Sequence, residues 1–127
     1  LAKLRHPRIV QLVDRQTFGG RTCLLLTLAG IETLHRLLAR EGTVSLDFAE
    51  RYGDDLLHAL EYLEEQQVMH RDLKPANLGV GSVGKGRAHL TLFDFSLSHA
   101  SRTDLKLGTA AYRDPFLDLR GEWDTAA

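Results

Sequence analysis

The sequence has almost no cysteine, no long hydrophobic run and no excess of charge of one sign. Cys23 is the only cysteine among 127 residues, so no internal disulfide can form and a reducing, cytoplasmic setting is expected. The run Cys23–Leu28 is far too short to cross a bilayer. Because 16 basic and 17 acidic residues leave a formal net charge of −1 without any basic block, we expect no nucleic-acid partner, and no membrane partner within this segment.

The residues that are present are typical of a globular chain. Hydrophobic residues make up 43% and charged residues 26%, which is ordinary for a packed domain. The sequence contains no internal repeat and no low-complexity segment, and its length suits one domain or part of one. Cys23 lies inside an apolar run, which predicts a buried core position for its side chain.

Glycines and capping residues divide the first third of the chain. Two short apolar runs, 9–13 and 23–27, flank the pair Gly19-Gly20 and predict a strand hairpin. A helical spacing of leucines then begins after Thr33, a candidate N-cap, and stops at Gly42. This part of the chain is therefore predicted to be a hairpin followed by a short helix.

A longer helix and a second hairpin are predicted next. Ser45 is a candidate N-cap, and apolar residues recur every three or four positions over 48–63. Strands are predicted at 78–80 and 88–93, and the turn between them contains Gly81, Gly84 and Gly86. Apolar periodicity fades after Phe95, which predicts an irregular loop. Hairpins and helices in this order predict an α+β fold.

Two short motifs carry the chemistry. The first is His70-Arg71-Asp72-Leu73-Lys74-Pro75-Ala76-Asn77, and the second is Asp94-Phe95-Ser96. Phosphoryl transfer needs one carboxylate to accept the proton of the acceptor hydroxyl and another to hold Mg²⁺ against the phosphates. It also needs a cation to offset charge on the transferring group. These motifs supply all three kinds of group.

With these motifs, the sequence resembles the eukaryotic-type serine/threonine protein kinases from Leu4 to about Asp124. Four blocks carry the resemblance in the family's order, namely 4–12, 23–29, 70–77 and 108–115. The resemblance implies a partial protein-kinase-like fold over 1–127. Residues 1–29 would be a remnant of the N-lobe strands and the hinge, and residues 30–127 would be the start of the helical C-lobe.

The resemblance also implies catalytic roles, residue by residue. Asp72 would be the base that orients the acceptor hydroxyl, and Lys74 would contact the γ-phosphate of ATP. Asn77 and Asp94 would be the Mg²⁺ ligands, since both offer the hard oxygen atoms that Mg²⁺ prefers. Thr109 would steady Asp72 and Lys74. The implied partner is a protein substrate with a serine or threonine acceptor.

A nucleotide site is implied as well. Leu25 would be the gatekeeper, and the hinge backbone near Leu26 and Leu28 would bind adenine. Glu32 would lie near the ribose, although a carboxylate at a helix N-terminus, stabilised by the helix dipole, is the favoured interpretation. Gly79 falls where the family places an apolar side chain beneath the adenine, so nucleotide affinity or preference is expected to differ.

Two further departures from the family occur. Ser96 replaces the usual glycine, and serine tolerates a positive φ less well. Asp114-Pro115-Phe116 replaces Ala-Pro-Glu, so the ion pair that the glutamate makes with a late arginine is expected to be absent. This end of the segment is similar to kinases of bacterial phage-defence islands. The family's glycine-rich loop and strand lysine would precede Leu1, so we expect residues 1–127 alone to be inactive.

Two other function classes remain open. A pseudokinase, a nucleotide-binding or scaffold module of the same fold, is suggested by Ser96, Gly79 and Phe116. The four retained catalytic and metal-ligand residues argue against it, because a scaffold does not need them. A small-molecule phosphotransferase of related fold typically lacks Lys74-Pro75 and Gly108-Thr109, and it ranks third.

Several neighbouring residues have predicted structural or regulatory roles. Arg71, beside Asp72, is a candidate receptor for a phosphate on the loop, and the acceptors would be Ser98, Ser101 and Thr103. His70 is expected to pack on Phe95, with Leu12 extending the stack. Trp123 is expected to pack on helices that would follow residue 127.

Overall fold

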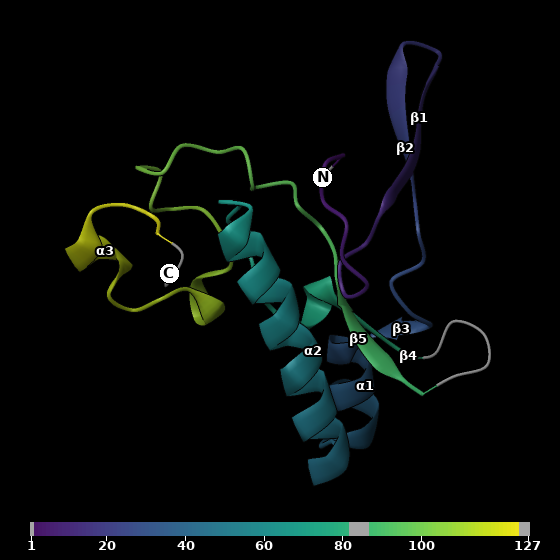
Figure 1. The fold of residues 1–127 in the computed structure, drawn as a ribbon. Helices are drawn as coiled ribbons and strands as arrows, with labels where there is room; N and C mark the ends of the chain where they lie inside the picture. Colours follow the sequence, from purple (N-terminus) through teal and green to yellow (C-terminus); the bar gives the residue numbers. More distant parts are fainter. Residues whose placement is uncertain (1, 82–86, 125–127) are drawn as a thin grey trace.

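The computed structural model describes residues 2–81 and 87–124, and its architecture is α+β, as predicted (Figure 1). The helices are α1 (Leu34–Glu41), α2 (Leu46–Glu65) and α3 (Leu117–Arg120), with 3-10 turns at Pro75–Asn77 and Ala110–Tyr112. The strands are β1 (Leu12–Phe18), β2 (Arg21–Leu26), β3 (Glu32–Thr33), β4 (Leu78–Gly81) and β5 (His89–Leu92). Two glycines of the predicted turn, Gly84 and Gly86, lie outside the described residues.

The first hairpin is confirmed, but its first strand starts later than predicted. Strands β1 and β2 are antiparallel, and both Gly19 and Gly20 have positive φ, at 54° and 76°, as a two-residue hairpin turn requires. Ile9 does not join this sheet, because it bridges Leu92 of β5 and is only 2% exposed. The apolar run 9–13 is therefore shared between the core and the hairpin.

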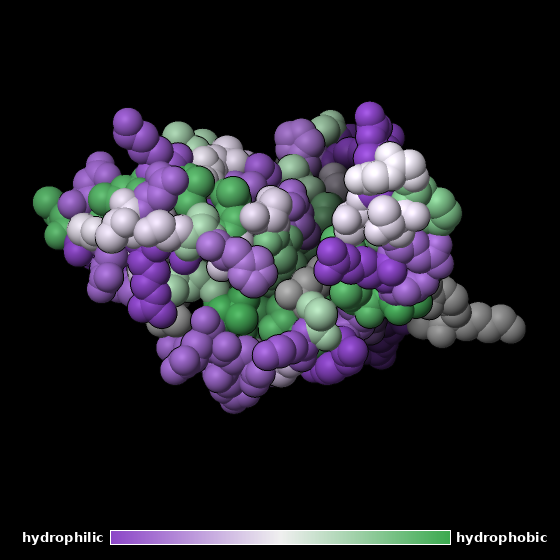
Figure 2. Space-filling view, turned by 90° about the horizontal axis from the view of Figure 1, so that it is seen from above, coloured by the Kyte–Doolittle hydropathy of each residue, from purple (hydrophilic) through white to green (hydrophobic). Residues whose placement is uncertain are grey.

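Cys23 is exposed, so the prediction of a core position is wrong. Every residue of β2 is exposed, and the hairpin stands away from the helices in Figure 1. Within the described part of the chain, no second layer covers this two-stranded sheet, so apolar side chains such as Phe18 and Leu24 lie at the surface. Seen from above, green apolar atoms lie among purple polar ones on the surface (Figure 2).

The predicted helix ends are confirmed by their caps. Thr33 Oγ1 accepts a hydrogen bond from the backbone N–H three residues later at 3.2 Å, and Ser45 Oγ does the same at 3.3 Å. Gly42 ends α1 with a φ of 76° and donates its N–H to Leu38 O at 2.8 Å. These local contacts satisfy backbone groups that a helix leaves unpaired at its ends.

The core lies between α2 and the sheet β3-β4-β5. Strand β4 pairs with both β3 and β5 in antiparallel register. Helix α2 packs across this sheet in Figure 1, and its inward face contributes Tyr52, Ala59 and Leu63. Full burial of one large apolar side chain stabilises a fold by about 1.5–3 kcal/mol, so this face is what fixes α2 on the sheet.

A buried carboxylate that the sequence analysis did not single out also binds α2 to β5. Asp55 is 7% exposed. It accepts hydrogen bonds from Arg8 Nε at 2.7 Å, from His89 Nδ1 at 3.2 Å and from Leu90 N–H at 2.9 Å. A buried charge is tolerated only when it is paired and hydrogen-bonded, and these three partners meet that condition.

Strand β4 lies in unusually close contact with the segment that follows β2. A Cβ atom placed on Gly79 would lie 2.5 Å from the carbonyl oxygen of Ala29 and 2.7 Å from its Cβ. A Cβ on Gly30 would lie 2.6 Å from Val80 O. The space beneath the predicted adenine site is therefore not left open by Gly79, because the backbone of Ala29 fills it.

No helix in the described ranges 2–81 and 87–124 combines the length and the apolar character that a membrane span requires.

Candidate active site

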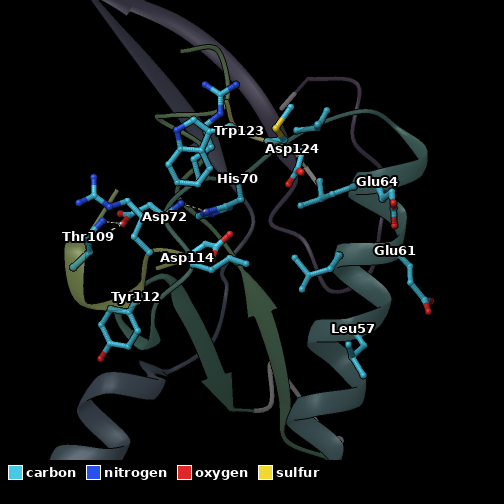
Figure 3. A pocket seen from close by; sticks show the side chains of 17 residues that line it. Leu57, Glu61, Glu64, His70, Asp72, Thr109, Tyr112, Asp114, Trp123 and Asp124 are labelled. Atoms are coloured by element: carbon cyan, nitrogen blue, oxygen red, sulfur yellow. Dashed lines mark hydrogen bonds between the residues drawn. The ribbon is translucent and has the colours of Figure 1, made fainter. Parts of the chain in front are cut away.

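The ends of three core elements bring the predicted catalytic side chains together. Asp72 and Lys74 lie in the loop between α2 and the 3-10 turn Pro75–Asn77, and Asn77 ends that turn. Phe93 N–H donates to Asn77 O at 3.1 Å, so Asp94 leaves the end of β5 beside Asn77. Thr109 reaches the same loop from the far end of the chain (Figure 3).

The carboxylate of Asp72 accepts four hydrogen bonds. Its Oδ1 accepts from Thr109 N–H at 2.9 Å and from Thr109 Oγ1 at 2.7 Å. Its Oδ2 accepts from Asn77 Nδ2 at 3.1 Å and from Lys74 Nζ at 2.7 Å. Lys74 Nζ also donates to Thr109 Oγ1 at 2.7 Å. Four of the five predicted catalytic residues therefore form one closed network.

This network keeps Asp72 ionised. Burial alone raises the pKa of the Asp72 carboxyl, but hydrogen bonds from Lys74, Thr109 and Asn77 outweigh burial and lower the pKa below its usual value. The ammonium of Lys74 has three N–H groups, and Asp72 and Thr109 accept two of them. One N–H of Lys74 therefore remains for another anionic group.

His70 stabilises the catalytic loop through a ring contact and two hydrogen bonds. Its ring meets Phe95 edge-on, with centroids 4.8 Å apart, which confirms the predicted contact. Nε2 donates to Phe93 O at 2.8 Å, and Nδ1 accepts from Asp72 N–H at 3.2 Å. This pattern requires the neutral imidazole, and the pKa of His70 is lowered because burial disfavours its charged form, although the bond to the Phe93 carbonyl opposes this.

His70 should therefore make stability depend on pH. The unfolded chain binds a proton at this histidine near pH 6.5, whereas the folded chain binds it only at lower pH, so stability should fall as pH drops below about 6.5. We expect His70→Gln to flatten this fall in denaturant unfolding measured between pH 7.5 and 5. The exposed His35 provides the matched control His35→Gln, which should leave the pH profile of the parent. An equal slope in parent and His70→Gln would contradict this role.

Asn77 and Asp94 offer a donor set that suits Mg²⁺. Asn77 Nδ2 donates to both Asp72 O and Asp72 Oδ2, which turns the amide oxygen to the other side of the group. Asp94 is exposed and uses Oδ1 to accept from Ser96 N–H at 3.3 Å. Mg²⁺ in phosphate sites uses one or two protein oxygens together with phosphate and water, so the residues present fit this ion.

The left-handed backbone conformation in this motif lies at Asp94 and not at Ser96. Asp94 itself has a positive φ of 65°, and such a conformation is uncommon for residues other than glycine. Ser96 is not among the residues with positive φ in the described chain. Replacement of the family's glycine by Ser96 therefore introduces no left-handed residue in this conformation.

The predicted nucleotide-binding residues lie outside the cavity that adjoins the catalytic loop. Leu25, Leu26 and Leu28 are exposed. Glu32 lies in β3, and both of its carboxylate oxygens accept from Arg40, at 2.7 and 2.9 Å. These hydrogen bonds lower the pKa of Glu32. Glu32 directly precedes Thr33, the N-cap of α1, as the helix-terminus interpretation expects, and it also makes an ion pair that spans α1.

A cavity of about 380 Å³ adjoins the catalytic loop. Leu57, Glu61 and Glu64 line it from α2, and Asp72 and Thr109 line its other side (Figure 3). Lys74, Asn77 and Asp94 are not part of its lining. The cavity therefore includes Asp72 and Thr109 but not the other three predicted catalytic residues.

One prediction about the end of the chain needs correction. Trp123 is 2% exposed, and its indole N–H donates to Asp104 O at 2.9 Å, so the loop after β5 buries it without any further helix. The segment that replaces Ala-Pro-Glu makes local ion pairs of its own. Arg120 pairs with Asp114 at 3.1 Å and with Asp124 at 3.0 Å, a pairing that short-range sequence spacing could have suggested.

Arg71 is buried, and its guanidinium group already donates hydrogen bonds to the loop that follows β5. Its NH1 group donates to the carbonyls of Leu97, Ala100 and Ser101, while its Nε has no partner among the described residues. Burial and the nearby positive charge of Arg102 lower the pKa of Arg71. A phosphate on this loop remains a prediction, but Arg71 makes three contacts to the loop without one.

The fold and this network define a protein kinase domain. The chain matches the family described as "Protein kinase domain" over residues 1–117, and it belongs to that family.

Similar proteins include "Probable kinase PglW" of Streptomyces coelicolor, at 33% identity over 96% of this chain and 9% of the relative. They also include "CBL-interacting protein kinase 11" of Oryza sativa subsp. japonica, at 33% identity over 97% of this chain and 25% of the relative. "Serine/threonine-protein kinase ULK3" of Rattus norvegicus is 32% identical over 98% of this chain and 27% of the relative. The chain thus spans 27% or less of the length of these three relatives. Membership of the protein kinase family and the similarity to a bacterial kinase, both predicted from the sequence, are confirmed.

Proposed function

We propose that the protein containing this chain transfers the γ-phosphoryl group of ATP, with Mg²⁺, to serine or threonine hydroxyls of protein substrates. The observation that carries this proposal is the carboxylate of Asp72, held by Lys74, Asn77 and Thr109 in one network. A structural carboxylate in a polar loop does not need four donors and a paired lysine.

In this proposal Asp72 orients the acceptor hydroxyl and takes up its proton. The lowered pKa of Asp72 suits that task, because phosphoryl transfer passes through a loose transition state and relies mainly on positioning and charge. Lys74 would turn its remaining N–H toward the transferring phosphoryl group. Bound Mg²⁺ would neutralise charge on the phosphates, and Asn77 and Asp94 would hold it.

The nucleotide would lie along the edge formed by Leu26, Leu28, Glu32 and Gly79. Leu25, the predicted gatekeeper, would lie at the inner end of the nucleotide site. Glu32 would reach a ribose only after it releases Arg40. In domain terms, residues 1–29 would belong to the N-lobe and hinge, and residues 30–127 to the C-lobe. A cytoplasmic setting belongs to the same proposal, because an exposed unpaired thiol at Cys23 suits a reducing compartment.

Transfer of labelled phosphate tests this proposal directly. The full-length protein, incubated with γ-labelled ATP, Mg²⁺ and a peptide library that contains serine, threonine and tyrosine acceptors, should label serine or threonine. A pseudokinase would bind nucleotide without labelling any peptide. Labelling confined to a small molecule would favour the phosphotransferase alternative, and labelling confined to tyrosine would contradict the assignment of Lys74.

A further inference from the structure

Hydrogen bonds to its main-chain carbonyl oxygens fix the loop that follows β5. Arg71 NH1 donates to the carbonyls of Leu97, Ala100 and Ser101. Further along, side chains and backbone from the segment 113–124 bind the next carbonyls. In all of these contacts the acceptor is a main-chain carbonyl oxygen.

Trp123 makes two of these contacts. Its backbone N–H donates to Arg102 O at 2.8 Å, and its indole Nε1–H donates to Asp104 O at 2.9 Å. The side chain is almost fully buried, at 2% exposure, and a buried indole N–H is normally placed where it finds such a partner. Arg113 adds a third contact, from NH1 to Leu105 O at 2.6 Å.

The position of Trp123 is itself fixed from the same segment. Arg120 binds Asp124, the neighbour of Trp123, and also Asp114, the neighbour of Arg113. The guanidinium of Arg120 therefore links the neighbours of Arg113 and Trp123, the two residues that bind the loop. Charge-assisted hydrogen bonds of this kind are the stronger class in proteins.

The held loop leads directly to the catalytic carboxylate. Gly108 has a φ of +81°, and a Cβ on it would collide with Arg71 O and lie 3.8 Å from the ring of Trp123. The next residue, Thr109, donates both its N–H and its hydroxyl to Asp72. Because Trp123 binds Asp104, five residues before Thr109 in the same loop, a shift of Trp123 would alter how Thr109 approaches Asp72.

We propose that Trp123 and Arg113 are positioning residues that hold loop 102–108 against the catalytic loop before any phosphate is added, so that Thr109 meets Asp72 in the unmodified protein. This inference rests on the proposed kinase activity for its catalytic consequence, but the ordering of the loop can be measured without that activity. It differs from the phosphate-receptor role predicted for Arg71, in which a modified loop residue supplies the order.

The test uses phosphatase-treated full-length protein and compares the parent with Trp123→Phe and Arg113→Met. Phenylalanine keeps a buried ring and loses the indole N–H, and methionine keeps the apolar stem of arginine and loses its donors. Loss of one net hydrogen bond corresponds to about a two- to tenfold change in an equilibrium. We therefore expect amides 101–108 to exchange with deuterium about two- to tenfold faster in each variant. We also expect kcat to fall by a similar factor, with the nucleotide Kd unchanged.

Leu119→Ala is the matched control, because Leu119 lies in the same segment and is 84% exposed. It should leave both exchange and kcat at the parent level. The positioning role is overturned if loop exchange is unchanged in both variants, or if phosphatase treatment abolishes transfer by the parent. If Trp123→Phe does not fold, Arg113→Met carries the test alone. A parent that never transfers phosphate, yet shows faster loop exchange in the variants, would refute the proposed function while supporting the role of these residues in holding the loop.

Discussion

Asp72→Asn is expected to reduce kcat by at least about a hundredfold, because a positioned general base contributes typically about 10²–10⁴-fold. The amide can neither take up the proton nor accept four hydrogen bonds, since its NH₂ group would face the donors Lys74 and Asn77 or Thr109. The nucleotide Kd should change little, because the proposed role of Asp72 is exerted on the acceptor hydroxyl in the transition state.

Two variants serve as comparisons for this measurement. Asp47→Asn removes an exposed carboxylate of α2 whose ion-pair partner among the described residues is Arg51. This variant should leave kcat unchanged. Asp94→Asn should instead raise the Mg²⁺ concentration required for activity, since Asp94 is the proposed metal ligand. Transfer at the parent rate by Asp72→Asn would overturn the central assignment, and a parent without transfer would favour the pseudokinase alternative.

Features set by local chemistry could be predicted from the sequence. The Gly19-Gly20 turn and the caps Thr33 and Ser45 depend on residues a few positions apart, and the structure has each of them where the pattern indicated. The catalytic loop also follows from local spacing, because Asp72, Lys74 and Asn77 lie within six residues. Asp94 and Thr109 had to be brought in from a distance, and the family resemblance supplied both.

Features that depend on which distant segments meet could not be predicted. Exposure of Cys23 follows from the lack of a covering layer over β2 within the described chain, and burial of Trp123 follows from a loop about 20 residues upstream. The ion pair of Asp55 did leave a signal. It lies three residues after Tyr52 and four before Ala59, on the buried face of α2, where a carboxylate indicates a buried cationic partner.

Substitutions at Gly79 distinguish open space beneath the proposed adenine site from close packing against Ala29. If the missing side chain left space beneath the adenine, Gly79→Leu would fill that space at no cost to stability and with tighter nucleotide binding. In the structure the space holds the backbone of Ala29, with its carbonyl oxygen 2.5 Å and its Cβ 2.7 Å from the position of an added Cβ. A collision with backbone cannot be relieved by turning a side chain.

We therefore expect Gly79→Ala to destabilise the domain by about 1–3 kcal/mol, as overpacking of a tight core does, and Gly79→Leu by at least as much. Because Ala29 follows the hinge residue Leu28, the displaced backbone should also raise the KM for ATP. Gly53→Ala is the matched control. Gly53 lies within α2 with no atom within 4 Å of its added Cβ, so alanine there should stabilise the helix by about 0.5–1 kcal/mol.

Denaturant unfolding of the three variants in the full-length protein measures these effects, and steady-state kinetics gives the KM for ATP. The opposite signs expected for Gly79→Ala and Gly53→Ala distinguish close packing at β4 from the general effect of replacing glycine, which acts through the unfolded chain at both sites. A Gly79→Leu protein as stable as the parent and with a lower KM for ATP would show that the space beneath the adenine is open. That result would contradict the role assigned to the close contact between Ala29 and Gly79.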